Sequence, residues 1–82
     1  MKLPRDLSGR ELARLLRRFS YEIVRQEGSH LRLTSNHRDH PHHITIPDHA
    51  ELKIGTLRKI IRLVAEYVEM EPADLIRELF GR

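Results

Sequence analysis

The segment EGSHLRLTS, residues 27–35, decides the fold of this chain. Its Glu-Gly start predicts a turn at Gly28, because glycine adopts a positive φ without strain. Leu31 and Leu33 then alternate with polar side chains, which is the pattern of a strand with one buried face. We therefore expect a strand over residues 30–35 that begins directly after a turn.

Two further strands flank this one. Residues 21–26 carry β-branched and aromatic side chains and form a hairpin with it, although the pattern leaves open whether Ile23 or Val24 points inward. Residues 42–46 alternate again, with isoleucines on the inner face. Pro47 is expected to end this third strand, because proline cannot continue a hydrogen-bonded ladder.

Helical patterns precede and follow the three predicted strands in the sequence. Ser8 opens a capping box before a leucine stripe, which predicts a helix over residues 9–18. Thr56 is the expected N-cap of a second helix that reaches residue 67, and Pro72 starts a third helix. The predicted order is α-β-β-β-α-α, an α+β fold in which a three-stranded antiparallel sheet packs on helices.

The composition is that of one small domain covering residues 1–82. The absence of cysteine excludes disulfides, thiolate metal sites and cysteine nucleophiles. No apolar run is long enough for a membrane span and no secretory signal is visible, so we expect a cytoplasmic protein without a membrane partner. A net charge of +3, from 15 Lys and Arg against 12 Asp and Glu, favours a phosphate-rich partner.

The predicted sheet has a polar face on the side away from its core. The side chains on that face are His30, Arg32, Thr34, His43 and Thr45. Imidazole, guanidinium and hydroxyl groups can together hold a phosphate and move a proton. A plain solvated strand face is the alternative. The Gly-Ser pair just before the first histidine favours a site, since a turn glycine lets a ligand approach closely and serine can donate a hydrogen bond.

The start of the second helix is another candidate site. Lys53, Arg58 and Lys59 surround Gly55 and Thr56 there. Free amides at a helix N-terminus bind anions, and a bound phosphate would offset the repulsion between first-turn cations and the helix dipole. A helix start whose lysines only aid solubility is an equal alternative.

Histidines gather around the loop expected over residues 36–41. The cluster consists of His37, His40, His42, His43 and His49. Neighbouring histidines can bind zinc, nickel or copper, and Asp39 or Asp48 could complete a shell. The spacing matches no fixed metal motif, so we expect a flexible polar loop without a metal site, with weak adventitious metal affinity as the alternative.

Three runs carry a family resemblance. They are LSGRE at residues 7–11, VRQEGSHL at residues 24–31 and TIPDHAELKIGTLRKI at residues 45–60. Together they resemble the HicA (YcfA-like) toxin family. The resemblance implies one HicA-like domain with a fold similar to that of double-stranded-RNA-binding domains. It also implies the toxin of a type II toxin–antitoxin system, an endoribonuclease that cleaves mRNA without a ribosome, with a HicB-type antitoxin as its partner.

The resemblance places the family's catalytic histidine at His30. We expect a metal-independent reaction without a cofactor, in which a ribose 2′-hydroxyl attacks the adjacent phosphate and this histidine acts as general acid or base. Candidate supporting residues are Gly28, Ser29, His43, His49 and Lys53, and the second proton carrier is open between the two histidines. Candidate RNA contacts are Arg10, Arg14, Arg17, Arg32, Lys53, Gly55, Thr56, Arg58, Lys59 and Arg62.

Two other functions stay open at this point. The first is a non-catalytic double-stranded-RNA-binding-like module, or an inactive toxin, with the same fold and the same basic face. The second is a metal-binding protein that uses the histidine loop. Aromatic residues make up only 5% of the chain, which favours recognition of RNA by shape over recognition by base stacking.

Overall fold

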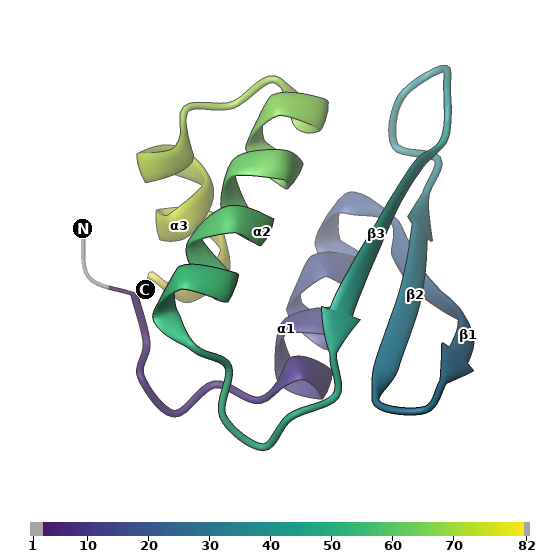
Figure 1. Ribbon diagram of the computed structural model, residues 1–82. Coiled ribbons are helices and arrows are strands. Elements are labelled where there is room, and N and C mark those ends of the chain that lie inside the picture. The colour runs from purple at the N-terminus through teal and green to yellow at the C-terminus, as the bar shows by residue number, and fades with distance from the viewer. Residues whose placement is uncertain (1–2, 82) are drawn as a thin grey trace.

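The computed structural model describes residues 3–81 (Figure 1). In chain order the elements are α1 (Gly9–Leu15), the 3₁₀ helix η1 (Leu16–Phe19), β1 (Tyr21–Glu27), β2 (His30–Ser35), β3 (His42–Pro47), α2 (Ile54–Val68) and α3 (Pro72–Phe80). This order confirms the predicted α-β-β-β-α-α arrangement, and the fold is α+β and of the double-stranded-RNA-binding-domain type.

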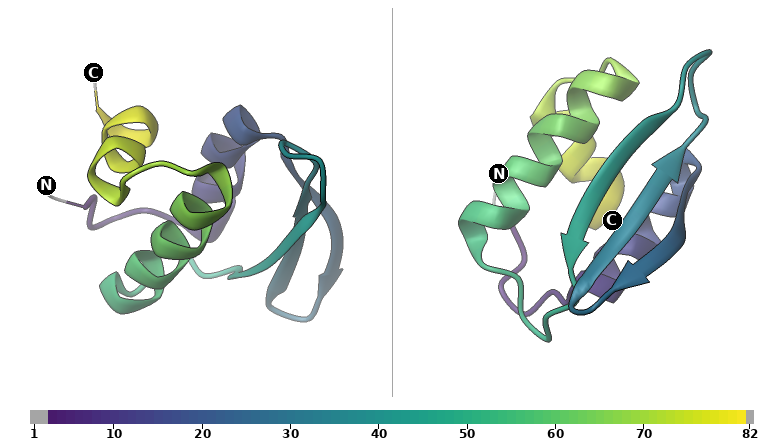
Figure 2. Two further views of the ribbon diagram at one scale, coloured as in Figure 1. Left: turned by 90° about the horizontal axis from the view of Figure 1, so that it is seen from above. Right: turned by 45° about the vertical axis from the view of Figure 1, so that its right-hand side comes forward.

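The three strands form one antiparallel sheet in the order β1-β2-β3, with the helices on one side of it (Figure 2). Leu31, Leu33, Ile44 and Ile46 are each at most 5% exposed, so β2 and β3 bury their predicted apolar faces against the helices. The polar residues between them therefore face away from the core, as their alternation predicts.

The first helix is shorter than predicted. The α-helix ends at Leu15, and the chain continues as a tighter 3₁₀ turn through Phe19, where a single helix over residues 9–18 was expected. Ser20 then adopts a left-handed conformation with φ 68° and directs the chain into β1. Phe19 is thereby turned into the core, where only 9% of its surface is exposed.

The hairpin turn and the end of β3 also lie one residue from their predicted places. β1 extends through Glu27, so the turn consists of Gly28 and Ser29, with Gly28 at φ 59°. Pro47 belongs to β3 and pairs with His30. Proline is tolerated there because β3 is an edge strand and its ladder ends at this residue.

Thr56 is not the N-cap of α2, and this prediction was wrong. The helix begins at Ile54, and Lys53, in an extended conformation, is the N-cap. The Lys53 carbonyl accepts the first helical hydrogen bond from the Leu57 amide at 2.9 Å. The start lies earlier because the Leu52 amide is tied to a carbonyl of the N-terminal segment at 2.8 Å, after which the chain turns directly into the helix.

The N-terminus of α1 is fastened to the connection between β3 and α2. The predicted capping box is present, with the Ser8 hydroxyl and the Glu11 carboxylate each accepting the other's amide at 3.0 and 2.8 Å. These hydrogen bonds lower the pKa of Glu11. Gly9 donates its amide to the His49 carbonyl at 3.0 Å, and a Cβ on Gly9 would collide with the Pro47 carbonyl. Glycine is thus required where α1 crosses the end of β3.

β1 is poorly covered by the helices. Tyr21 is fully buried, but Ile23 and Val24 are 44% and 63% exposed, so the helices bury neither of the two residues between which the sequence could not choose. Ile23 pairs with Leu33 and lies on the helix side, and the register shifts between Ile23 and Arg25, which marks a β-bulge.

The C-terminal helix α3 packs on α2 through Leu75 and Leu79, which are 0% and 5% exposed. Among the helices of the described part of the chain, none combines the length and the apolar character needed to cross a membrane.

Candidate nucleic-acid interface

His30 is the first residue of β2 and lies on the exposed side of the sheet. It pairs with Glu27 of β1 on one side and with Pro47 of β3 on the other. Within residues 3–81 its ring has no hydrogen-bond partner, so both ring nitrogens face solvent or a ligand. This is the position that the sequence predicts for an imidazole that exchanges protons with a substrate.

The turn that carries His30 is held by neighbouring strands. The Asp48 amide donates to the Ser29 carbonyl at 2.7 Å, which fixes the turn to the residue that follows β3. The Gln26 side-chain amide donates to the Gly28 carbonyl at 3.2 Å and to the Asp48 carboxylate at 3.2 Å. Both turn carbonyls are therefore occupied, and the backbone before His30 has little freedom.

Arg10 of α1 completes this network. Its guanidinium donates to the Gln26 side-chain oxygen at 2.9 Å and to the Asp48 carboxylate at 3.1 Å. We call Arg10, Gln26 and Asp48 the turn brace, because the three side chains join the first helix, the hairpin and the end of β3. The sequence predicted Arg10 as an RNA contact, and the structure places its guanidinium on partners within the chain.

A groove runs along the β3 edge of the sheet, beside α2. Its volume is about 500 Å³, and it is lined by Arg32, His43, Ile44, Thr45, Pro47, Thr56, Lys59, Ile60 and Leu63. We call it the α2–β3 groove. It brings together Arg32, Thr56 and Lys59, three of the predicted RNA contacts, although they come from β2 and from two turns of α2. Two cations beside two threonine hydroxyls form a place where a phosphate backbone can bind.

The α2–β3 groove opens beside His30, because Pro47 both pairs with that histidine and lines the groove. His43 also lines the groove, with its Nδ1 2.8 Å from the Thr34 hydroxyl. It precedes Pro47 by four residues, which separates it from His30 by about 13 Å along the sheet. The two imidazoles therefore lie on the same face of the sheet but too far apart to contact the same phosphate.

His49 is positioned differently, because it follows Asp48 and its carbonyl accepts the Gly9 amide at 3.0 Å. Its backbone thus lies beside the turn that carries His30, and the residue is exposed. Of the two histidines that the sequence offered as a second proton carrier, His49 is the closer to His30 along the hydrogen-bonded backbone.

The first turn of α2 borders the same groove. Lys53 and Gly55 are exposed there, and a Cβ built on Gly55 meets nothing within 4 Å, so packing does not require a glycine at this position. Arg58 and Arg62 are exposed but do not line the groove, since they lie on another side of the helix from Thr56 and Lys59.

A second hollow lies at the other edge of the sheet, between α1 and β1. It has a volume of about 350 Å³ and is lined by Arg10, Ala13, Arg14, Arg17, Glu22 and Ile23. We call it the α1–β1 groove. The predicted RNA contacts are thus divided, with Arg10 and Arg14 at one edge of the sheet and Arg32, Thr56 and Lys59 at the other.

The histidines in and beside the β2–β3 loop each have partners within the chain. The His37 ring meets the edge of Phe19, with centroids 5.6 Å apart, and His40 Nδ1 lies 3.0 Å from the Asp39 carboxylate. His42 stacks on Tyr67 at 4.6 Å. In the described residues, no three or more histidine and acidic side chains come together as a metal shell would require.

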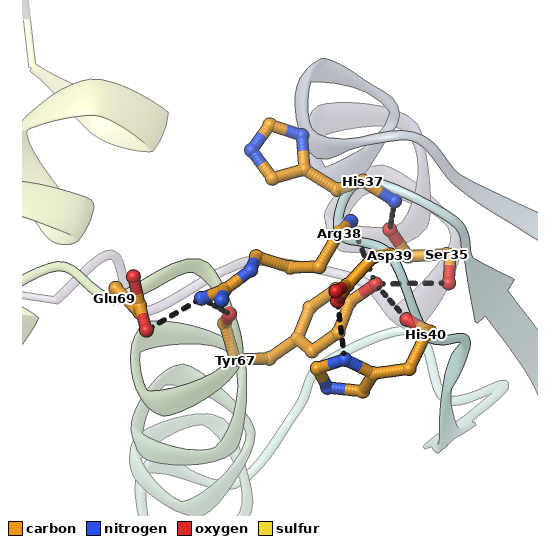
Figure 3. Close-up of polar contacts among 7 residues, drawn as sticks. All are labelled: Ser35, His37, Arg38, Asp39, His40, Tyr67 and Glu69. Carbon is orange, nitrogen blue, oxygen red and sulfur yellow. Dashed lines mark hydrogen bonds and ion pairs between the residues drawn. The ribbon is translucent and has the colours of Figure 1, made fainter.

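Tyr67 of α2 holds this loop in place (Figure 3). Its hydroxyl donates to the His40 carbonyl at 2.6 Å and accepts the Arg38 amide at 2.9 Å. The Arg38 guanidinium in turn pairs with Glu69 at 2.7 Å. The loop is therefore an ordered part of the fold, whereas the sequence predicted a flexible polar loop and did not identify Tyr67 as its anchor.

His42 lies between two tyrosines, with its Nδ1 2.7 Å from the Tyr21 hydroxyl and its ring stacked on Tyr67. Burial of the imidazole lowers the pKa of His42, and the neighbouring His43 and His40 lower it further. Burial also raises the pKa of Tyr21, so both groups stay neutral near pH 7.

The sequence did not predict that Gln26 and Asp48 hold the turn together with Arg10. Gln26 and Asp48 both lie within the runs that carry the family resemblance. The signal that could have identified them is the register: an antiparallel hairpin followed by a third strand brings the residue after Pro47 beside Ser29.

The fold and the site define a small basic α+β protein of double-stranded-RNA-binding-domain type, with an exposed histidine at the end of a basic groove. A comparison with family models gives the more specific result. The model described as the HicA toxin of bacterial toxin–antitoxin systems matches residues 9–64, from the start of α1 through most of α2. The chain belongs to the HicA toxin family. Neither the search of curated proteins nor that of solved structures returned a match.

Proposed function

We propose that this HicA-family toxin is a metal-independent endoribonuclease that cleaves mRNA at a phosphate bound beside His30. The observation that supports this function best is the position of that histidine. It follows a braced turn and pairs with Pro47, which lines the α2–β3 groove together with Arg32 and Lys59. An RNA backbone in the groove would bring its next phosphate to the imidazole.

The reaction follows from what an imidazole can do at neutral pH. His30 takes the proton from a ribose 2′-hydroxyl, and the 2′-oxygen forms a bond to the adjacent phosphorus. The bond to the 5′-oxygen of the next nucleotide breaks, and that oxygen takes up a proton, which leaves a 2′,3′-cyclic phosphate and a 5′-hydroxyl. The departing oxygen needs a proton donor, and His49 is the better placed of the two candidates because it adjoins the Asp48–Ser29 hydrogen bond.

Other residues of this site bind the substrate and the developing charge. Gly28 and Ser29 leave the space in front of His30 open, because both are exposed and the glycine has no side chain. Lys53 and the free amides at Gly55 and Thr56 would stabilise negative charge on the phosphate. Arg58 and Arg62, on the outer side of α2, would contact the backbone beyond the groove.

The experiment is an RNA cleavage assay with a labelled transcript in the presence of EDTA. We expect the wild-type protein to cleave and His30→Ala to lose about 10²–10⁴-fold in rate, while RNA binding in a gel-shift assay persists. A substrate with a 2′-deoxyribose at the cleaved position should resist cleavage. His37→Ala is the matched control, because it removes a histidine at the opposite end of the sheet and should cleave normally.

Each contrary result points to a definite alternative. RNA binding without cleavage by the wild-type protein would make this a binding module or an inactive toxin. Cleavage by His30→Ala at the wild-type rate would exclude this histidine as the proton carrier. Loss of cleavage in EDTA would require a metal that the proposal does not contain.

The family also implies a protein that neutralises the toxin. We propose a HicB-type antitoxin as this partner and the cytoplasm, where mRNA is translated, as the place of action. Co-expression tests this directly: a neighbouring open reading frame that restores growth and co-purifies with the wild-type chain would be the partner.

A further inference from the structure

β1 offers a free backbone edge along an uncovered strand. Only Tyr21 of its seven residues is buried, and the six that follow are exposed. β1 is the first strand in the sheet order, and among the described residues no strand pairs with its outer edge. The other edge strand, β3, has α2 alongside it (Figure 1). An exposed edge with free N–H and C=O groups is a template for another strand.

The α1–β1 groove lies beside that free edge and is apolar in part. Ala13 and the half-exposed Ile23 are its apolar lining residues, and Arg14 of α1 and Arg17 of η1 line it as well. Within residues 3–81 neither of these two arginines makes an ion pair. Glu22 is the single carboxylate of the lining, against three arginines, so the groove is basic overall.

These features together fit one kind of occupant, an extended protein segment that carries carboxylates. Its backbone would satisfy the free edge of β1, an apolar side chain would cover Ile23, and acidic side chains would pair with Arg14 and Arg17. RNA fits less well. Phosphates cannot match the alternating donors and acceptors of a strand edge, and the exposed aliphatic side chains of Ile23 and Val24 offer them neither charge nor a hydrogen bond.

A second copy of this chain fits less well again. Pairing two β1 strands about a two-fold axis would bring two sets of Arg14 and Arg17, which line the groove, toward each other. Like charges placed across an interface oppose association. The positive charge of the groove therefore favours an acidic partner over a second copy of this chain.

We propose that the α1–β1 groove binds an extended acidic segment of a partner protein, which adds a strand to the free edge of β1. The docking itself needs no catalytic activity. Its consequence for the toxin rests on the function proposed above. Strands are about 4.8 Å apart, so an added strand lies about 10 Å from β2 at His30, and the bulk of the partner could cover that histidine. The α2–β3 groove would stay unoccupied.

The test is an NMR titration of the ¹⁵N-labelled wild-type chain with short peptides. The probe is the acetylated and amidated peptide TETVTET, which as a strand places its two glutamates and its valine on one face. We expect saturable shifts at millimolar peptide in the amides of residues 22–26 and of Arg14 and Arg17. TKTVTKT should cause no shifts, and a TETVTET peptide N-methylated along the pairing edge should bind at least about fivefold more weakly.

Variants separate this docking surface from the proposed catalytic site. Ile23→Ser should weaken TETVTET binding severalfold and leave RNA cleavage unchanged, because Ile23 is exposed and does not line the α2–β3 groove. Arg14→Gln combined with Arg17→Gln should abolish the peptide shifts. His30→Ala should bind the peptide like the wild type, so a failure of the proposed ribonuclease activity would leave this measurement intact.

Three outcomes would overturn the proposal. The first is the absence of shifts with TETVTET at millimolar concentration, or shifts confined to α2. The second is equal binding of the N-methylated peptide, which would exclude strand addition. The third is a titration with a uridine oligonucleotide that shifts the α1–β1 groove and is displaced by salt, which would make the groove a nucleic-acid contact.

Discussion

The two edges of the sheet carry similar charge but different surroundings. The α2–β3 groove places Arg32 and Lys59 among hydroxyls and an imidazole, next to a strand whose edge is accompanied by a helix. The α1–β1 groove places Arg14 and Arg17 beside exposed aliphatic side chains and an unpaired strand. Positive charge alone would assign both grooves to RNA. The accompanying groups are the reason why we propose phosphate binding for the first groove and protein docking for the second.

The turn brace is the connection between the two edges. Arg10 lines the α1–β1 groove, and its guanidinium reaches Gln26 and Asp48, which hold the turn before His30. A partner seated in the α1–β1 groove would lie against one member of the brace. This contact relates the two grooves physically, even though their linings share no residue.

The largest expected effect comes from removing the brace with Gln26→Ala and Asp48→Asn together. The Gly28 carbonyl loses its partner, and the turn gains freedom, which misplaces His30 by an ångström or more. We expect kcat for RNA cleavage to fall by about 10²-fold with little change in KM, because the α2–β3 groove still binds the substrate. Single-turnover cleavage across a range of RNA concentrations measures both constants.

Glu22→Gln is the control for the brace, since Glu22 is exposed, pairs with Thr34 at the far end of the hairpin and, within residues 3–81, makes no side-chain hydrogen bond or ion pair. Equal losses in kcat for this variant would show that any change in the hairpin slows the reaction. An unchanged kcat in the double variant would mean that the brace does not position His30. The ¹³C and ¹⁵N resonances of its ring should shift in the double variant and not in the control.

The fold was predictable because most of its signals are local. The alternation from His30 to Ser35, the capping box at Ser8 and the stripe of the second helix each depend on residues within a few positions. The predictions that were wrong concern element boundaries that are set by contacts with distant segments of the chain. Thr56 has the chemistry of an N-cap, yet α2 starts earlier because Leu52 is tied to the N-terminal segment.

The candidate site was predictable in its types of residue and less so in its arrangement. Sequence order identifies the polar face that holds His30, Arg32 and His43. It cannot show that Arg10 is bonded to Gln26 and Asp48, because the three residues meet only when α1 crosses the sheet. The same holds for the β2–β3 loop, whose anchor at Tyr67 comes from a helix more than twenty residues later.

A smaller effect should distinguish the charges of the two edges. Lys59→Gln removes a cation of the α2–β3 groove, and Arg17→Gln removes one from the α1–β1 groove. For single-stranded RNA, the slope of log affinity against log salt should become less steep by about 0.7 in Lys59→Gln, with a severalfold loss of affinity. Arg17→Gln should leave the slope unchanged. Fluorescence anisotropy with a uridine oligonucleotide from low to high salt measures both.

The opposite pattern would reverse the assignment of the grooves. A reduced slope in Arg17→Gln with none in Lys59→Gln would place the RNA backbone along α1. Equal reductions in the two variants would mean that the RNA reaches both edges, and the contrast between them would then lie only in the aliphatic surface of β1.

The smallest expected effect concerns Gly55 and has opposite signs for stability and binding. Glycine weakens a helix by roughly 0.5–1 kcal/mol relative to alanine, and packing does not require it here, since a Cβ at this position meets nothing within 4 Å. Gly55→Ala should therefore raise the urea midpoint slightly. If a phosphate rests on the first turn of α2, the added methyl group should also lower RNA affinity severalfold. A gain in stability with unchanged affinity would instead leave Arg32 and Lys59 to hold the backbone, and the first turn of α2 would have no part in the site.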